Sequence, residues 1–446
     1  MVRPSVKVYE GQELHTRVPA SAQVMQRPTP DCPRPINVLF NGTNGENTPD
    51  RFFLTEKLLS QHLMLIGGIG SGKTNTFNQI LQTIVPQLSS KDVMIIFDTK
   101  GDFYKEFYRP GDIVISNDST ARGSTGVDYW NLISEIDGTI GIKEDVIEIA
   151  NGLFADKLKT AGDNSFFPQA AKDIMSALLY HFVMLRNKGI LKCDNNIISE
   201  SMKKEDLDWY RKILLTYPNY AAMQSYIPKD AMEQALGVLA ELQQVVRALF
   251  VGNFAKKGEL SIRKLVRNKG GKKIFIEYDI GLGSMLTPIY SLLFDLAIKE
   301  ALCRSKSDGN VFFVCDEFKL LPNLKHIDDA VNFGRSLGIK FMIGVQNVDQ
   351  IIETYGENRA MNIFSGFLNV FAFKVGDYTS RNYIKERLGE NRKCTVYKSS
   401  TVQESIATAH VVEDWDIASL NTGEAIVSIN SSEPFKFRFS QFAGRR

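Results

Sequence analysis

The stretch HLMLIGGIGSGKTNTFNQIL, residues 62–81, decides the fold. Its apolar start, residues 62–66, predicts a short buried strand, and a helical pattern opens at Lys73 directly after a glycine-rich break. In that context the spacing G-x-x-x-x-G-K-[ST] is typical of a phosphate-binding loop, or P-loop. Its glycines let backbone N–H groups line an anion-binding concavity, and the helix N-terminus adds a positive end. The sequence therefore predicts a site for a nucleoside triphosphate.

The residues of this loop divide into phosphate and metal contacts. Lys73 can reach the β- and γ-phosphates, and the hydroxyl of Thr74 is placed to bind Mg²⁺. We therefore expect ATP and Mg²⁺ as cofactors. The predicted nucleotide contacts come from Gly67, Gly70, Ser71, Gly72, Lys73 and Thr74.

A P-loop also needs an acid at the end of a neighbouring strand, and two segments offer one. Residues 93–98 end in Asp98, with no carboxylate directly after it, whereas residues 311–315 are followed by Asp316 and Glu317. Adjacent acids can divide the work: Asp316 supports Mg²⁺ and Glu317 activates the attacking water as general base. We prefer the second segment, because hydrolysis needs a base as well as a metal ligand, and Asp98 is the alternative.

Two further polar residues are candidates. Gln346 ends the predicted strand 341–345, at the carboxyl edge where parallel sheets bind ligands, and it can orient water or sense the γ-phosphate. An ordinary polar strand end explains it equally well. Arg335 falls between the paired acids and Gln346. A lone arginine is usually a surface residue, and it gains a role only in a ring, where it could enter a neighbour's site.

Short apolar strands separated by helical stretches predict an α/β fold with a mainly parallel sheet. A turn at residues 41–45 predicts a β-hairpin before the P-loop strand. The proline-broken residues 1–35 predict a partly extended arm or linker that can pack on a neighbour. The other predicted strands are residues 93–98, 113–115, 274–276, 311–315, 341–345, 369–373 and 425–429.

Between residues 140 and 250 the pattern is helical throughout, which predicts an all-α domain inserted into the nucleotide-binding domain. The predicted helices are residues 145–157, 166–185, 204–215 and 230–250. The expected division is 1–50 for the arm and hairpin, 51–140 and 256–446 for the two parts of the nucleotide-binding domain, and 141–255 for the all-α domain.

Composition limits the partners only weakly. The net charge of +2 gives no general argument for nucleic acid, but residues 256–273, called the basic run below, carry eight Lys and Arg against the single acid Glu259. That run could follow a phosphate backbone or be a solvated loop. The five scattered cysteines favour a reducing cytosol. Every apolar stretch falls short of the ~20 residues that span a bilayer.

Together these motifs resemble one family, the coupling-protein ATPases of conjugation and type IV secretion (the TraD/TraG group), relatives of the FtsK and HerA DNA motors. The resemblance runs from about residue 50 to 442. Thr99 and Asp102 replace Pro and Glu of the family's second motif, and a proline is absent after Asn131. The matching segments are HLMLIGGIGSGKT (62–74), IIFDTKGDFYKEF (95–107), VDYWNLI (127–133), VCDEFKLLPNL (314–324), FGRSLGIKFMIGVQNVDQIIETYGE (333–357) and VVEDWDIASLNTGEAIVSI (411–429).

The resemblance implies a RecA-like core, an all-α domain facing the cytosol, a hexameric ring and ATP-driven movement of DNA through its pore. It assigns Lys73 and Thr74 to phosphate and Mg²⁺, Asp316 and Glu317 to metal and water, Gln346 to sensing the γ-phosphate, and Arg335 to a finger supplied to the neighbouring subunit. Family members usually begin with a two-helix membrane anchor. Since this sequence shows none, we expect a cytoplasmic protein recruited to the inner face of the membrane by a partner protein.

Two classes of function remain open from the sequence. The first is an oligomeric, Mg-ATP-dependent motor that translocates DNA, most naturally in conjugative transfer. The second is a nucleotide-dependent docking receptor that recruits relaxase or effector proteins, or an ATPase of DNA processing or defence. The fold resemblance does not choose between them, because function lies in the site.

Overall fold

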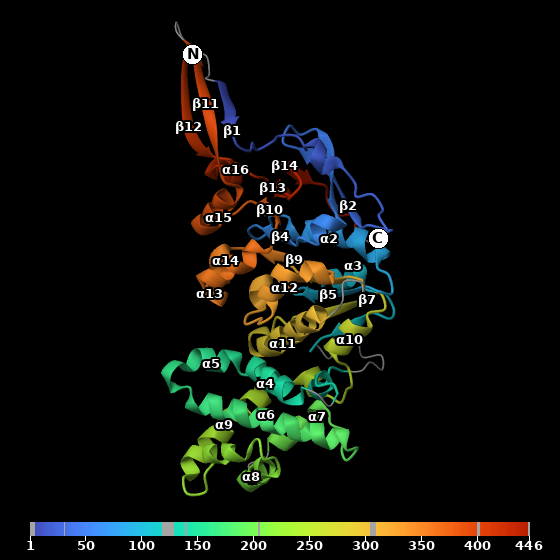
Figure 1. Cartoon of the computed structure of the whole chain (residues 1–446), viewed down its shortest axis with the longest axis vertical. Coiled ribbons are helices and arrows are strands. Elements are labelled where there is room, and N and C mark those ends of the chain that lie inside the picture. Colours follow the sequence, from blue (N-terminus) through green and yellow to red (C-terminus); the bar gives the residue numbers. More distant parts are fainter. Residues whose placement is uncertain are drawn as a thin grey trace.

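The computed structural model describes residues 5–30, 32–117, 129–138, 141–203, 206–303, 309–398 and 402–444. The molecule is elongated, with a small three-stranded sheet at one end, a large sheet flanked by helices in the middle, and a helical tier at the other end (Figure 1). Within the described ranges, no helix is long and apolar enough to cross a membrane.

In the described part of the chain the large sheet has eleven strands, and the seven from β10 to the edge strand β6 are parallel. The remaining four pair antiparallel at one side. The predicted α/β fold with a mainly parallel sheet is therefore confirmed. The spatial order is β3 (Pro49–Thr55), β2 (Asn37–Asn44), β14 (Phe435–Phe439), β13 (Glu424–Ser428), β10 (Asn369–Phe373), β4 (Leu63–Ile66), β9 (Ile339–Val345), β8 (Val311–Cys315), β5 (Val93–Asp98), β7 (Lys272–Glu277) and β6 (Ile113–Ile115).

Two apolar cores lie on the two faces of this sheet, which is why its strands read as continuous apolar runs. In β4, Met64 and Ile66 face one core and Leu63 and Leu65 face the other, as the two-residue period of a strand requires. Helices α11 (Gly283–Leu302), α12 (Ile327–Phe333), α13 (Val348–Tyr355), α14 (Glu357–Ser365) and α15 (Tyr378–Leu388) contribute to the first core, and α2 (Lys73–Ile84) and α3 (Asp102–Phe107) to the second.

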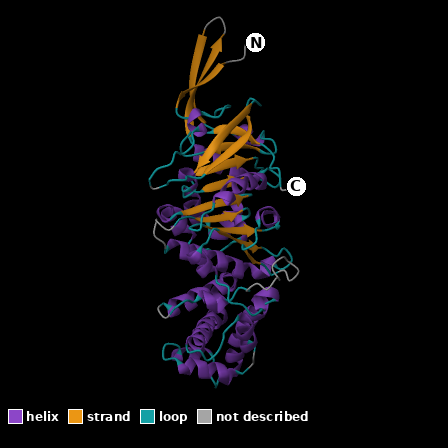
Figure 2. Ribbon diagram, turned by 90° about the vertical axis from the view of Figure 1, so that its right-hand side faces the viewer, coloured by secondary structure: helices purple, strands orange, loops and turns teal. Residues whose placement is uncertain are grey.

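The helical tier lies between β6 and β7 in the sequence, and it is seen as a block of helices at the end of the molecule in Figure 2. The predicted helix 145–157 is divided at Phe154, and residues 204–205 of another lie outside the described ranges. The short α7 was missed because its sequence, NNIISESM, is largely polar. The helices of the tier are α4 (Ile142–Leu153), α5 (Ala155–Ala161), α6 (Phe166–Asn187), α7 (Asn195–Met202), α8 (Leu207–Thr216) and α9 (Met232–Leu249). The next helix, α10 (Ile262–Asn268), lies beside the large sheet and packs on α11 (Figure 1).

The N-terminal arm packs on its own chain, and packing on a neighbouring subunit stays a prediction. Strand β1 (Ser5–Glu10) pairs with β11 (Glu390–Lys398), which forms a hairpin with β12 (Val402–His410). Further along, Val18 and Ala22 are buried in the same core as the sheet.

The predicted hairpin before the P-loop strand is present, but its turn was placed wrongly. Strand β2 continues through Asn44, and the chain reverses after it, with the amide of Asn44 donating to the carbonyl of Thr48 at 3.0 Å. Gly42 is needed for close approach rather than for a turn, because a Cβ there would lie 2.0 Å from the carbonyl oxygen of Arg438.

Candidate nucleotide-binding site

Three neighbouring strands bring the predicted site residues to one edge of the sheet. The P-loop follows β4, Gln346 follows β9, and Asp316 follows β8, with β9 lying between the other two. Because the three strands are parallel, their carboxyl ends meet at this edge. Parallel sheets bind ligands at such edges.

The P-loop is held in shape by close packing against the C-terminal part of the chain. A Cβ on Gly67 would lie 2.6 Å from the Cβ of Phe373, and a Cβ on Gly72 would lie 2.9 Å from the Cα of Gly423. Gly72 also has a φ of 115°, a conformation that side chains disfavour. Both positions therefore require glycine.

Lys73 points back into the loop, where its ammonium group donates hydrogen bonds to the carbonyl oxygens of Gly67 and, at 3.1 Å, Gly68. Burial lowers the pKa of Lys73, and the charges of Asp316 and Glu317 oppose that shift. The lysine therefore lies where the phosphates of a nucleotide would be cradled.

The oxygens expected to hold Mg²⁺ come together. The hydroxyl of Thr74 donates to Oδ2 of Asp316 at 2.6 Å, while Oδ1 of Asp316 and the hydroxyl of Ser71 are buried with no hydrogen-bond partner in the described chain. Burial raises the pKa of Asp316, and the Thr74 hydrogen bond and Lys73 oppose it. A buried carboxylate oxygen and a hydroxyl are hard donors that fit Mg²⁺, so these residues suit the metal.

The general-base candidate is positioned by the predicted sensor. The amide of Gln346 donates a hydrogen bond to Oε2 of Glu317. Burial raises the pKa of Glu317, and the charge of Lys319 opposes that shift most. A raised pKa makes the carboxylate a stronger base than a free glutamate. The structure thus brings together Lys73, Thr74, Asp316, Glu317 and Gln346.

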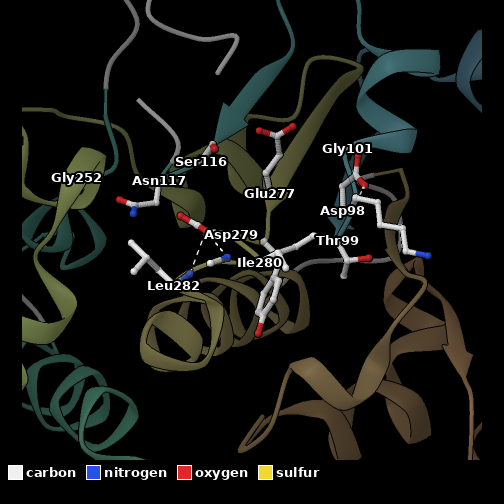
Figure 3. Close-up of a pocket in the computed structure, with 13 residues that line it drawn as sticks. Asp98, Thr99, Gly101, Ser116, Asn117, Gly252, Glu277, Asp279, Ile280 and Leu282 are labelled. Atoms are coloured by element: carbon white, nitrogen blue, oxygen red, sulfur yellow. Dashed lines mark hydrogen bonds between the residues drawn. The ribbon is translucent and has the colours of Figure 1, made fainter. Parts of the chain in front are cut away.

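Asp98, the alternative acid, has other contacts. Its carboxylate accepts hydrogen bonds from the backbone amides of Tyr104 at 2.8 Å and Lys100 at 3.3 Å, so it orders the turn into α3. It also lines a separate groove, with Glu277 and Asp279 further along (Figure 3). The structure places Asp316, and not Asp98, against Thr74.

Arg335 is far from the P-loop of its own chain. It is exposed, in the 3₁₀ turn Gly334–Leu337 that precedes β9. Since β9 has seven residues and Gln346 follows its last one, Arg335 lies at the opposite edge of the sheet, roughly 23 Å away along the strand. It does not join the site within one subunit.

Sequence reasoning missed one residue near the site, Lys100. Its charge lowers the pKa of Asp316 and also that of Lys73. A signal was present, because Lys100 lies in the segment 95–107 that was matched to a family motif. Of another matched segment, 127–133, residues 127 and 128 lie outside the described part of the chain.

Much of the basic run is used inside the protein. Arg263 and Arg267 form ion pairs with Glu300 at 3.2 and 2.9 Å, and Lys273 is buried against Asp112 at 2.9 Å. The run is therefore not a continuous stripe of free charge. Its members on the surface include Lys257, Lys264 and Lys272.

The chain has the fold of a P-loop NTPase. In this class a parallel sheet carries a P-loop after one strand and an acid after a nearby strand, and here β9 separates the two strands concerned. Within this class, the chain belongs to the type IV secretion-system coupling protein DNA-binding domain family, whose model matches residues 53–417.

Curated relatives agree with this assignment. The chain is 22% identical to the coupling protein TraD of Escherichia coli (strain K12) over 366 residues, which are 79% of this chain and 48% of TraD. It is 21% identical to the type IV secretion system-coupling protein VirD4 of Bartonella henselae, over 74% of this chain and 53% of VirD4. The chain thus spans about half the length of these relatives.

Solved structures show the same fold. The bacterial conjugative coupling protein TrwBdeltaN70 has a TM-score of 0.72 at 20% identity, covering 89% of each chain. The plasmid coupling protein TrwB in complex with ADP and Mg²⁺ has a TM-score of 0.68 at 18% identity, again covering 89% of each chain.

Proposed function

We propose that this chain is the motor of a coupling protein, an oligomeric Mg-ATP-dependent ATPase that translocates DNA in conjugative transfer or type IV secretion. The observation that carries the proposal is the meeting of Thr74, Asp316, Glu317 and Gln346 at one sheet edge, beside the P-loop. Family membership and relatives named as coupling proteins support the process.

The chemistry follows from what each side chain can do. Thr74 and Asp316 would hold Mg²⁺, which supplies positive charge to the phosphoryl group as it transfers. Lys73 binds the β- and γ-phosphates. Glu317 accepts a proton from the attacking water, and Gln346, already bonded to Glu317, orients that carboxylate.

We also propose a division of labour along the chain. Residues 51–140 and 256–446 form the nucleotide-binding domain, 141–255 form the all-α domain, and residues 1–50 form the arm and hairpin. The proposed assembly is a homo-hexameric ring in which Arg335 reaches a neighbour's nucleotide. The exposure of Arg335 at the amino edge of the sheet supports this geometry.

A second candidate function is a docking receptor for relaxase or effector proteins. The helical tier exposes large apolar side chains at the starts of α6 and α9, and such surface patches commonly bind proteins. Phe166, Phe167, Met232 and Leu236 are 46%, 40%, 50% and 49% exposed. The two functions are compatible in one protein, but they predict different responses to DNA.

One experiment separates them: ATP hydrolysis measured with and without single- and double-stranded DNA, together with the mass of the assembled particle. The motor predicts hydrolysis that rises on adding one DNA form and disappears in Lys73→Ala, in a particle of about six chains. Hydrolysis indifferent to both DNA forms favours the docking receptor. Unchanged hydrolysis in Lys73→Ala contradicts the P-loop assignment itself.

A further inference from the structure

The segment that follows β14 lies along α2, the helix that begins at the P-loop. The side-chain amide of Asn75 donates to the carbonyl of Ser440 at 3.0 Å, and the backbone amide of Phe442 donates back to Oδ1 of Asn75 at 2.7 Å. Gln79, one turn further along α2, donates to the same Ser440 carbonyl at 2.6 Å. Asn75 directly follows Thr74, so these bonds act beside the nucleotide site.

A second contact holds the P-loop itself. The amide of Gly423, in the turn before β13, donates to the carbonyl of Ser71 at 2.8 Å. Phe439, the last residue of β14, donates in turn to the carbonyl of Gly423 at 2.8 Å. The P-loop is therefore bonded through its backbone to the turn before β13, and α2 is bonded through its side chains to the segment after β14.

The far side of this segment is fixed independently of the P-loop. The amide of Ser440 donates to the carbonyl of Asn41 in β2 at 3.0 Å, and the ring of Phe442 packs beside that of Phe107 in α3, with centroids 6.0 Å apart. The segment thus joins α2 to two other elements. It can resist displacement of α2 because it has supports of its own.

We infer that residues 440–442 are a brace for the P-loop and that Asn75 is a positioning residue for nucleotide binding. The inference rests on the proposed nucleotide site and adds the element that keeps it ready. A P-loop already held in its binding conformation binds nucleotide more tightly, because less conformational entropy is lost on binding. By thermodynamic linkage, bound nucleotide must stabilise the contacts of the brace by the same free energy.

The test compares Asn75→Ala with Asn78→Ala in the full chain, with Mg-ADP as the probe. Asn78 is a matched control on the same helix, because its side-chain oxygen is buried with no hydrogen-bond partner in the described chain. Losing two hydrogen bonds in Asn75→Ala should weaken Mg-ADP binding about tenfold. The control should bind as wild type does, and turnover of Asn75→Ala at saturating ATP should be nearly unchanged.

Two further measurements separate positioning from a general loss of stability. Phe442→Ala changes the brace by a substitution outside α2. Like Asn75→Ala, it should weaken Mg-ADP binding. Hydrogen exchange at the amide of Phe442 should slow when Mg-ADP is added to wild type, and this response should vanish in Asn75→Ala.

If wild type and Asn75→Ala bind Mg-ADP equally well, the brace is refuted and the proposed function is not. The same holds if hydrogen exchange at Phe442 is unchanged when Mg-ADP is added. Absence of Mg-ADP binding in wild type overturns the brace together with the proposed function. Because binding is the readout, a chain that binds nucleotide without moving DNA still tests the brace.

Discussion

Thr74 and Asp316 are 242 residues apart in the sequence, and the hydroxyl of Thr74 donates a 2.6 Å hydrogen bond to the Asp316 carboxylate. The bond spans β9, the strand between those that carry the two residues. It brings together the two oxygens proposed to bind Mg²⁺, and it does so with a buried carboxylate, whose burial disfavours its charged form. Such a site is suited to function at the expense of stability.

Asp316→Asn should therefore stabilise the protein without nucleotide while impairing Mg²⁺-dependent nucleotide binding. Burial raises the folded-state pKa of Asp316, so the charged form is disfavoured in the folded protein. Wild type is therefore most stable, as far as this group is concerned, below the pKa that Asp316 has in the unfolded chain. That stability is lost as pH rises through the higher pKa of Asp316 in the folded protein. The variant should show a higher unfolding midpoint near neutral pH.

The control for this prediction is acid pH. At about pH 4, the ordinary pKa of an aspartate, much of the carboxyl is already protonated in both states, so the advantage of the variant should be much smaller than at pH 7. Thermal unfolding of both proteins at pH 4 and pH 7 measures this. A wild type more stable than Asp316→Asn at pH 7 would contradict the argument.

Glu317→Gln should bind nucleotide and fail to hydrolyse it. The substitution keeps the shape of the side chain and removes the base, with an expected loss of about 10²–10⁴-fold in rate. Asp98→Asn should retain hydrolysis, because Asp98 accepts backbone amides in the turn into α3. Single-turnover assays of both variants decide this. A dead Asp98→Asn beside an active Glu317→Gln would reverse the choice of acid.

Much of the large sheet could be predicted because strands such as β5, β8 and β10 are buried on both faces. Residues 93–98, 311–315 and 369–373 coincide with β5, β8 and β10, since an apolar run bounded by turns leaves few alternatives. The pairing of β1 with β11 could not be predicted in the same way. These strands are polar, and their register depends on a contact between the two ends of the chain.

The site was predictable where a motif fixes the local geometry and unpredictable where contacts are distant. The P-loop spacing and the acids at a strand end were enough to predict that Lys73, Thr74 and Asp316 lie together, as they do. Nothing local to Asn75 reveals that it bonds to Ser440, because that contact exists only once β14 has joined the sheet. The ion pairs within the basic run were hidden for the same reason.

Stability should also depend on pH through His326, which links the helical tier to the segment after the acid pair. Its Nδ1 lies 3.0 Å from Asp295 on α11, and its Nε2 lies 3.4 Å from Glu148 on α4, which also pairs with Lys299. Burial opposes its charge, but the hydrogen bond and charge of Asp295, with Glu148, outweigh it and raise the pKa of His326.

Because that pKa is raised, the stabilisation is fully present below the unfolded value of about 6.5 and lost as pH rises through the folded pKa. His326→Gln should remove this loss, so the unfolding midpoints of the two proteins should converge as pH rises from 6.5. Burial lowers the pKa of Lys325, the residue beside it. His15→Gln, which alters an exposed pair with Glu433, is the control. Parallel pH profiles for wild type and His326→Gln would refute the prediction.

Replacing the exposed lysines of the basic run should weaken DNA binding without unfolding the protein. For Lys257, Lys264 and Lys272 changed together to Gln, each lost phosphate contact should flatten the log–log salt dependence by about 1. Lys273→Gln is the contrast, because Lys273 is 2% exposed and paired with Asp112, and breaking a buried pair costs about 3–5 kcal/mol. Binding titrations at several salt concentrations measure the slope. If the slope of binding against salt concentration is unaltered, these lysines do not contact phosphates and the basic run is a solvated loop.

The last prediction concerns Arg335 and the proposed ring. Arg335 is exposed at the amino edge of the sheet, beside Phe333, which is 66% exposed, while the P-loop lies at the carboxyl edge. In a closed ring with head-to-tail contacts, each subunit turns one edge toward the opposite edge of its neighbour. An arginine delivered in this way stabilises charge on the transferring phosphoryl group, an effect worth on the order of 10³-fold or more in rate.

Arg335→Ala should therefore bind ATP and fail to hydrolyse it, as Glu317→Gln should. The two lesions lie on opposite edges, so mixed rings contain some interfaces that pair an intact Glu317 with an intact Arg335. Mixing the two inactive proteins should restore part of the hydrolysis. If Arg335 instead acted within its own subunit, every chain in the mixture would still lack either its arginine or its base. The mixture would then stay inactive. An inactive mixture in which subunit exchange has been demonstrated by mass therefore excludes a finger supplied to the neighbour.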